Sequence, residues 1–587
     1  MGTISDKLMR IINTKEDIRQ ALISKGYDVP TSIPFKEYAK MILDLPCKVD
    51  SFLDIEGIVA RYSASGLTNE QMAANPVWVD KTGNGHDIQL KKFSWKGMSG
   101  VGGYVQDFND FRNNATVDKI RIDEQGSNSI KVTILTTGIG NAIYIPKNIY
   151  QFNKSYFIKI SSEGYNEGDL SLSFYAPFIS TATTVKVPLN PNGITEIPAI
   201  KEDYFLAVYI NVSGKVGSFT VEQLPLYPGA LVFDGVDDYG TCDNFPVLTK
   251  EKGYTVVALR QWDQDFLNTT LTGGLLSTRN YSTGEGVAFE KIESSNKGYW
   301  NLGAGGIIDF AKSPFTWQTS KQYNNVGILK GDKNHGKPLC VGSGLSGGQQ
   351  CGRFAIWELV FLDHDATEEE LTKIKDYFVK TYPWLFPDQA WTVVGKTNED
   401  EDRATIANIT GNGNDLVLSN FGFAEGSGYN EEGEYAGYLV TDGVDDKIIS
   451  SIFKMGNDWT VIGDWELINT WKNNNAGIVK FDSIVIYNYN YNYNSILINI
   501  KNGRNILIPD QNTVNAICSD GRIYSKDWKE SIYNEETEST SKNFLTIGYS
   551  GNAYTKIAFK NLAIYPTVLS REDCIKAYNY LQTLKAK

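Results

Sequence analysis

The stretch TGNGHDIQL, residues 82–90, recurs as TGNGNDLVL at residues 410–418, and this repeat decides the fold. The offset between these two motifs is 328 residues (410 − 82). Two later pairs, FDGVDD with TDGVDD and FAIW with LAIY, recur at an offset of 208 residues, for example 441 − 233 and 562 − 354. Internal similarity of this kind predicts two copies of one domain, each of roughly 200 residues. The drop in offset (328 − 208 = 120) predicts an extra segment of that length inside the first copy.

Each copy is expected to be a β-sandwich that closes with one helix. The T-G-N-G and D-G-V-D-D motifs are typical of turns, because Gly and Asn tolerate positive φ and the side chain of Asp accepts hydrogen bonds from nearby backbone N–H groups. Apolar residues alternate after the turns, as in Tyr254, Val256 and Ala258. Thr367 with Glu370, and Ser570 with Asp573, predict the N-terminal caps of the two closing helices.

The extra segment also has the period of β-strands. Apolar side chains alternate in several runs separated by Gly, Asn and Pro, for example Leu170, Leu172 and Phe174. We therefore predict a smaller inserted β-sandwich. The predicted domains are a helical module at 1–46, a first sandwich at 47–110 and 228–387, the insert at 111–227, and a second sandwich at 388–587.

The first 46 residues predict three short amphipathic helices. A segment this small buries little core alone, so it is expected to dock on a larger body. The side chains expected to make that contact are Leu8, Ile11, Ile12, Ile18, Leu22, Phe35, Tyr38 and Ile42.

Composition narrows the classes of function. The chain has 587 residues and a formal charge of −13 (56 Lys and Arg against 69 Asp and Glu), which disfavours nucleic acid and anionic lipid as partners. Its six cysteines form no C-x-x-C pair, and its three histidines (His86, His335 and His364) lie far apart. No apolar run approaches the roughly 20 residues needed to cross a bilayer, so we expect no membrane insertion.

Two resemblances extend this picture. The repeated unit, through TGNGHDIQL, LVFDGVDDYG and FAIWELVFLDHDATEEEL and their counterparts, resembles concanavalin A-like (LamG-like) jelly-roll sandwiches. The fold class is thus expected to be mainly β: two such sandwiches, the first interrupted by the insert and preceded by a short α-helical module. The stretch LMRIINTKEDIRQALISKGYDVPTSIPFKEYAKMI, residues 8–42, resembles a module that opens structural proteins of tailed crAss-like phages of Bacteroidales.

The second resemblance implies a fibre or appendage on the head or tail of a virion. The protein would be made in the host cytoplasm, held by other virion proteins through its N-terminal module and exposed on the particle. A homo-oligomer is expected because linked copies gain avidity, with a trimer guessed by analogy to fibres. Carbohydrate binding and host attachment are the functions implied for such sandwiches.

Two kinds of chemistry are alternatives to this structural role. A glycan hydrolase needs two carboxylates flanking the scissile bond; Asp54 and Glu56 are the nearest pair, and the second copy has no counterpart, so we expect no catalytic residues and no enzyme. The turn acids Asp237, Asp238, Asp445 and Asp446 are weak candidates for calcium, and turn formation is the commoner role of such aspartates. No cofactor is otherwise expected.

The run YNYNYNYN, residues 487–494, is the candidate glycan contact. In a strand, Tyr487, Tyr489, Tyr491 and Tyr493 would share one face. Tyrosine rings can stack on sugars, but the same face could equally pack on the sheet or on a sister chain. We therefore predict a non-enzymatic virion protein with lectin-like sandwiches; the alternatives are a secreted or surface carbohydrate-binding protein and, less favoured, a concanavalin A-like glycan hydrolase.

Overall fold

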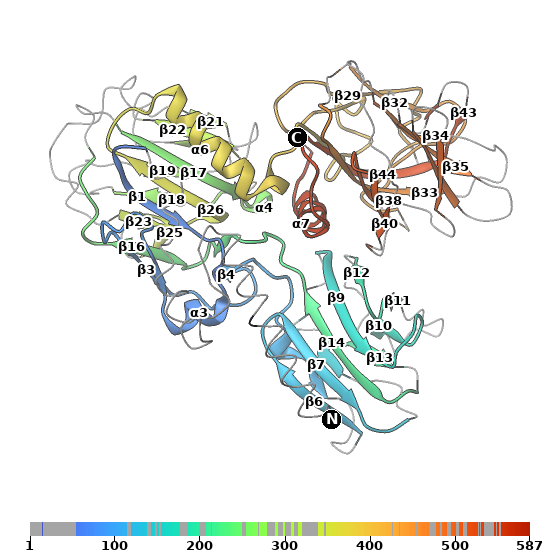
Figure 1. The fold of residues 1–587 in the computed structure, drawn as a ribbon, viewed down its shortest axis with the longest axis horizontal. Coiled ribbons are helices and arrows are strands. Elements are labelled where there is room, and N and C mark those ends of the chain that lie inside the picture. Colours follow the sequence, from blue (N-terminus) through green and yellow to red (C-terminus); the bar gives the residue numbers. More distant parts are fainter. Residues whose placement is uncertain are drawn as a thin grey trace. The chain divides into compact units, whose positions relative to one another are not determined.

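The computed structural model describes Lys15 and most of the chain from Ile55 to Ala586 (Figure 1). The chain divides into two compact units, Met1–Glu56 and Gly57–Lys587. Every strand given below belongs to the second unit. Within residues 55–586 the description leaves out 114–118, 138–142, 147–149, 152–153, 176–184, 199–206, 213, 249–253, 268, 279–287, 292–296, 300–306, 310–314, 320–338, 346–347, 425, 432, 434, 452, 454–455, 469–476, 482–483, 490–494, 501–503, 509–513, 526–527, 529, 533–544, 548 and 551–552.

The first sandwich has a six-stranded and a ten-stranded sheet. The smaller sheet has the order β22-β17-β26-β15-β4, with β1 also paired to β26; its strands are β1 (Ile58–Ser63), β4 (Gly100–Val101), β15 (Leu231–Asp234), β17 (Thr255–Trp262), β22 (Phe315–Thr319) and β26 (Arg353–Leu362). The larger sheet has the order β2-β3-β16-β23-β18-β19-β20-β21, with β25 beside β18 and β24; its strands are β2 (Val77–Trp78), β3 (Ile88–Lys91), β16 (Tyr239–Cys242), β18 (Gly273–Ser277), β19 (Ala288–Lys291), β20 (Lys297–Tyr299), β21 (Ile307–Asp309), β23 (Leu339–Val341), β24 (Ser343–Leu345) and β25 (Gln349–Cys351).

One hydrophobic core joins these two sheets. In β3, Ile88 and Leu90 are buried while the alternate residues are exposed, which is the period expected of a strand with one face on the core. Tyr62 packs 5.4 Å from Trp78 between ring centroids, and its hydroxyl donates to the carbonyl of His86 at 2.5 Å. The core thereby fixes the T-G-N-G-H-D turn in place.

The second sandwich repeats the order of the strands that it shares with the first, and one of its sheets continues with two further described strands. One sheet has the order β30-β31-β44-β33-β38-β39-β40, with β27 paired to β44; its strands are β27 (Gln389–Thr392), β30 (Gly428–Tyr429), β31 (Leu439–Val440), β33 (Thr460–Leu467), β38 (Val514–Cys518), β39 (Arg522–Ser525), β40 (Glu530–Ile532) and β44 (Ile557–Tyr565). The other has the order β28-β29-β32-β41-β34-β35-β36-β37; its strands are β28 (Thr405–Ile406), β29 (Leu416–Ser419), β32 (Lys447–Ser450), β34 (Gly477–Phe481), β35 (Ile484–Tyr489), β36 (Ser495–Ile500), β37 (Arg504–Ile508) and β41 (Thr546–Ile547). A separate hairpin holds β42 (Tyr549–Ser550) and β43 (Ala553–Tyr554).

The strand pairing corrects one of the sequence matches. Leu231 of β15 pairs with Ile356 of β26, and Leu439 of β31 pairs with Phe559 of β44. Because Leu231 and Leu439 are equivalent at an offset of 208, Ile356 and Phe559 are equivalent at an offset of 203 (559 − 356). The FAIW–LAIY match at 208 is therefore wrong by five residues, and the counterpart of LAIY is LVFL at 359–362.

The closing helices begin where the sequence predicts. Helix α6 (Glu368–Thr381) starts with a capping box between Thr367 and Glu370. Helix α7 (Arg571–Leu581) is capped by Ser570, whose hydroxyl accepts the N–H of Asp573 at 3.1 Å, and Cys574 on this helix is buried. The shorter helices are α3 (Asn69–Ala74), α4 (Gln264–Leu267), η2 (Phe108–Asp110) and η3 (Pro383–Leu385).

The inserted segment is a sandwich of two five-stranded sheets with its own core. One sheet has the order β11-β10-β13-β8-β5, with β5 (Arg112–Asn113), β8 (Ile143–Pro146), β10 (Leu170–Tyr175), β11 (Val185–Leu189) and β13 (Ala207–Val212). The other has the order β12-β9-β14-β7-β6, with β6 (Ile120–Gln125), β7 (Ser129–Ile134), β9 (Tyr156–Glu163), β12 (Ile194–Ile197) and β14 (Gly217–Gln223). Apolar side chains alternate inward, as in Ile130, Val132 and Ile134 of β7.

The two ends of the insert are hydrogen-bonded to each other. The buried side chain of Gln223 accepts the backbone N–H groups of Val105 (3.1 Å) and Gln106 (2.9 Å), and its amide donates to the carbonyl of Gln106 (3.0 Å). Next to this clamp, the N–H of Leu226 donates to the carbonyl of Gly103. The chain therefore enters and leaves the insert at one point.

The predicted fold class is confirmed: the described chain is mainly β and is built from several sandwiches. The predicted helices of residues 1–46 lie outside the described residues, apart from Lys15. The predicted domain boundaries stay predictions.

Candidate functional site

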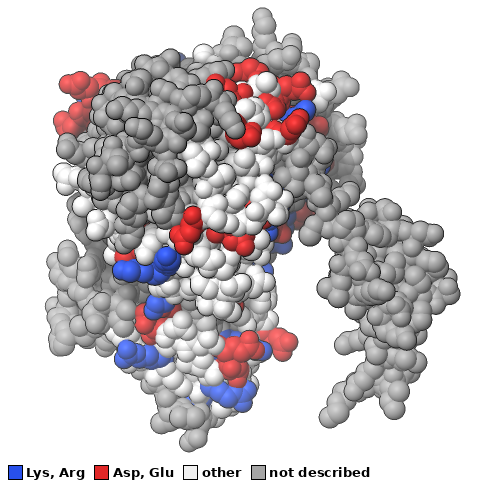
Figure 2. All heavy atoms as spheres, turned by 90° about the vertical axis from the view of Figure 1, so that its left-hand side faces the viewer, with Lys and Arg blue, Asp and Glu red and all other residues white. Residues whose placement is uncertain are grey.

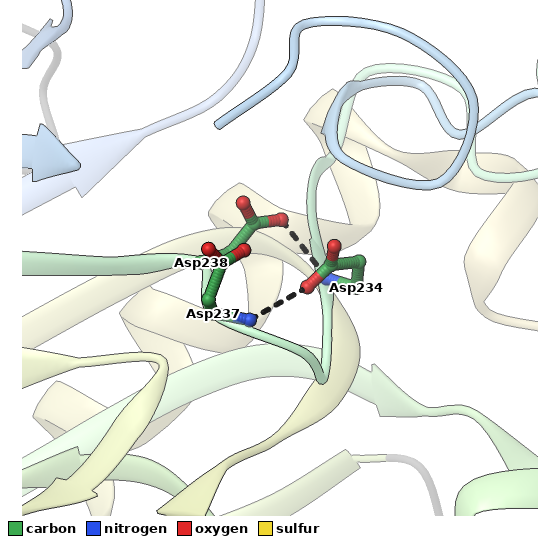
Figure 3. Close-up of side chains that lie close together, drawn as sticks. All are labelled: Asp234, Asp237 and Asp238. Atoms are coloured by element: carbon green, nitrogen blue, oxygen red, sulfur yellow. Dashed lines mark hydrogen bonds between the residues drawn. The ribbon is translucent and has the colours of Figure 1, made fainter. Parts of the chain in front are cut away.

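Two aspartate-rich turns are the clusters of acidic side chains that the sequence singles out. The first joins β15 to β16 (Figure 3). Asp234 Oδ1 accepts the N–H of Val236 at 2.7 Å and that of Asp237 at 3.4 Å. Asp238 Oδ2 accepts the N–H of Asp234 at 3.0 Å, which closes the turn (Figure 3).

The second turn, between β31 and β32, has the same bonds. Asp442 Oδ1 accepts the N–H groups of Val444 (2.7 Å) and Asp445 (3.2 Å), and Asp446 Oδ2 accepts the N–H of Asp442 (2.7 Å). Asp238 and Asp446 are buried, whereas Val236 and Val444 are 71% and 70% exposed. The repeated acids thus hold two equivalent turns with an exposed valine at each tip.

Each turn also depends on a glycine. Gly235 and Gly443 have φ of 76° and 75°, a backbone conformation that disfavours a side chain. A Cβ on Gly235 would lie 2.8 Å from that of Arg353, and one on Gly443 would lie 3.0 Å from the backbone N of Lys556. The D-G-V-D-D motif is therefore set by the geometry of the turn.

Two serines complete the turns, and sequence reasoning missed both. Ser99 donates to Asp238 Oδ1 at 2.9 Å, and Ser427 donates to Asp446 Oδ1 at 3.1 Å. The serines are separated by the 328-residue offset of the first repeat (427 − 99), and a Gly follows each. This Ser-Gly recurrence is the signal that could have identified them.

Burial changes the acidity of the two inner aspartates. Burial, together with the charge of Asp234, raises the pKa of Asp238 to about 8. Burial and the neighbouring charges of Asp442 and Asp445 raise the pKa of Asp446 to about 6. At neutral pH the side chain of Asp238 is therefore mostly a neutral acid.

The turns bring the candidate metal ligands together. One oxygen from each of Asp234, Asp237 and Asp238 lies within 4.8 Å of the others, and the same holds for the second turn. Several of these oxygens already accept backbone N–H groups, and Asp237 Oδ2 lies 3.7 Å from Lys92 Nζ. A cation would compete with these partners, so calcium at Asp237, Asp238, Asp445 and Asp446 stays a prediction.

The tyrosine run is only partly described. Tyr487 and Tyr489 lie in β35, opposite Leu497 and Ser495 of β36, while Tyr491 and Tyr493 lie outside the described residues. The predicted glycan contact through these four side chains remains untested.

The other candidates do not gather at one place. Asp54 and His335 lie outside the described residues, and Glu56 is exposed before β1. His364 lies between Asp363 (3.3 Å) and Glu370 (3.2 Å), beside the α6 cap. The attachment residues lie outside the described residues as well: Leu8, Ile11, Ile12, Ile18, Leu22, Phe35, Tyr38 and Ile42.

Charged side chains are mixed over the described part of the face in Figure 2, where lysine and arginine lie among aspartate and glutamate. In the part of the chain that the structure describes, no helix combines the length and the apolar character needed to cross a membrane.

No protein-family model and no curated protein matches the chain. Among solved structures, Trypanosoma rangeli sialidase in complex with sialic acid is 8% identical with a TM-score of 0.25, and the match covers 80% of this chain and 85% of that one. Domain 4 of AbnA, a GH43 extracellular arabinanase from Geobacillus stearothermophilus, is 11% identical (33% and 98% covered, TM-score 0.20). The binding domain of botulinum neurotoxin serotype D is 12% identical (59% and 89% covered, TM-score 0.24). Identities and scores this low carry no argument about ligand or reaction.

Proposed function

We propose that this protein is a non-enzymatic structural component of a phage virion, a fibre or an appendage, whose β-sandwiches bind glycans on a host or mucosal surface. The N-terminal module holds the chain on the particle, and the sandwiches form its displayed part. The chain acts as a homo-oligomer, so that weak binding at each sandwich adds up to avidity.

The duplication is the observation that supports this proposal most directly. Two sandwiches repeat one strand order, one turn and the serine bond to that turn, and a third sandwich interrupts the first. A chain with several copies of a binding domain makes more contacts with its ligand, whereas catalysis needs only one set of reacting groups. The described repeat acids bond their own turns, which is a structural role.

A glycan array probed with the full-length chain tests the binding part of the proposal. Retention on at least one glycan class, without release of sugar products, is the expected result. Binding to no glycan would remove the recognition role, and turnover of a bound glycan would replace it with the glycan hydrolase alternative.

Removal of residues 1–46 tests the attachment part. We expect the truncated chain to fold, to keep the thermal unfolding of the full chain and to be missing from purified particles, because the predicted docking side chains are gone. Immunoblots of particles made with the full and truncated chains measure this. Equal incorporation of the two chains would contradict attachment through the module.

A further inference from the structure

One sheet of the insert carries a row of five side chains on the face turned away from its core, and one of the five, Ser173, is itself buried. Strand pairing places Lys186 of β11 opposite Ser173 of β10, Ser173 opposite Tyr209 of β13, Tyr209 opposite Tyr144 of β8, and Tyr144 opposite Arg112 of β5. We call these five residues the tyrosine row. It crosses four inter-strand spacings of about 4.8 Å, or about 19 Å in all, a length suited to an oligosaccharide.

The row points away from the core of the insert. Its neighbours along β8 (Ile143 and Ile145) and along β13 (Val208 and Ile210) are buried in that core. Since side chains alternate along a strand, Tyr144 and Tyr209 lie on the opposite face, where both are half-buried.

The two tyrosines form a paired aromatic surface. Their ring centroids lie 5.6 Å apart, and the ring planes are inclined by 30°. Tyrosine offers a rigid, flat apolar ring with a polar tip, which suits a ligand that has both apolar faces and hydroxyl groups. Sugar rings have this character.

Charge distinguishes this sheet from the other sheet of the insert. Arg112 and Lys186 are exposed at the two ends of the row. The five strands of the sheet contain no aspartate or glutamate, whereas the five strands of the opposite sheet contain Asp123, Glu124, Glu163, Glu196 and Glu222. In a chain of net charge −13, a sheet with cations and without acids favours an anionic ligand.

We propose that the tyrosine row binds acidic glycans, an inference that rests on the proposed glycan-binding function and gives it a site and a ligand class. Tyr144 and Tyr209 pack against the apolar faces of sugar rings. Arg112 pairs with a sugar carboxylate, which its planar guanidinium can engage through two hydrogen bonds, and Lys186 adds a second positive charge.

Binding of oligogalacturonate to the full-length chain, measured by calorimetry beside its neutral methyl ester, tests the proposal. We expect the acid to bind about tenfold or more tightly than the ester and to weaken as salt rises. Arg112→Ser should weaken binding of the acid alone by about tenfold, and the double variant Tyr144→Ala with Tyr209→Ala should weaken both ligands. Equal affinity for acid and ester would overturn the acidic preference.

Arg121→Ser is the matched control, because Arg121 is an exposed cation on β6 of the opposite sheet. It should leave binding unchanged. Arg112→Ser alters only an exposed side chain, so it keeps the test decisive if the double tyrosine variant fails to fold. If the wild-type chain binds glycans of the array and the variants of the tyrosine row bind them equally well, only the inference about the tyrosine row fails. If the wild-type chain binds no glycan, the proposed glycan-binding function fails as well.

Discussion

At the scale of single residues, the repeated aspartates show how one motif combines an exposed tip with a buried base. In each copy the first Asp bonds the amides of the turn, and the last Asp is buried against a serine hydroxyl. The two copies nevertheless differ in acidity, since the pKa is raised to about 8 in Asp238 and to about 6 in Asp446.

This difference predicts two pH windows of stability that both begin at about pH 4 and end at different pH values. A carboxyl whose pKa is higher in the folded than in the unfolded chain stabilises the fold below the unfolded value and loses that contribution as pH rises to the folded value. Asp238 should therefore reduce the free energy of unfolding between about pH 4 and pH 8, by at most about 1.4 kcal/mol per pH unit. Thermal unfolding of the wild type and Asp238→Asn across pH 5–9 measures this, and the variant should lose that decline.

Asp446→Asn is the matched control in the second copy. It should change the pH dependence only below about pH 6, because the pKa of Asp446 is raised less. Identical profiles for the wild type and Asp238→Asn would show that Asp238 is ionised throughout.

At the scale of helices and strands, the sequence predicts the elements that have strong local signals and misplaces those that lack them. The α6 cap follows from Thr367 and Glu370 alone, and the strand after the T-G-N-G turn follows from its alternation. Strands β26 and β44 are buried at nearly every residue on both faces. They have no alternation to fix their alignment, so a chance likeness of letters shifted the match by five residues.

The cap gives a test at this scale. Thr367→Ala removes the hydroxyl that accepts the N–H of Glu370 at 3.3 Å, so it should lower the free energy of unfolding of the first sandwich by about 1 kcal/mol. Chemical denaturation measures the change. Thr367→Ser should retain the wild-type value, and an equal loss in both variants would assign the effect to the methyl group of threonine instead of the cap.

At the scale of the whole molecule, the duplication could be predicted because its turns are local in sequence, whereas the tyrosine row could not. Arg112, Tyr144, Ser173, Lys186 and Tyr209 come from five strands spread over almost a hundred residues, and only the strand order sets them side by side. The alternation of apolar residues in the insert predicted which side chains face its core. The role of the outward side chains depends on their neighbours across the strands, which follow only from the strand order.

The joined ends of the insert predict that it can be removed. Replacement of residues 107–222 by a short Gly-Ser linker keeps Gln106 and Gln223, and closing so short a loop costs little free energy. We expect both large sandwiches to fold with their native near-ultraviolet circular dichroism, while binding of oligogalacturonate is lost. Aggregation of the shortened chain, or loss of the unfolding transition of the first sandwich, would show that the insert is needed for folding.

The hydrogen bonds of Gln223 that join the two ends of the insert have a consequence for the evolution of the protein as well as for its folding. The two chain ends of the insert meet at one point, between β4 and β15, which pair directly with each other in the surrounding sandwich. During evolution, one inserted domain can then be exchanged for another through a single recombination event. The surrounding sandwich is inherited as a whole, and new domains are acquired at the insertion point.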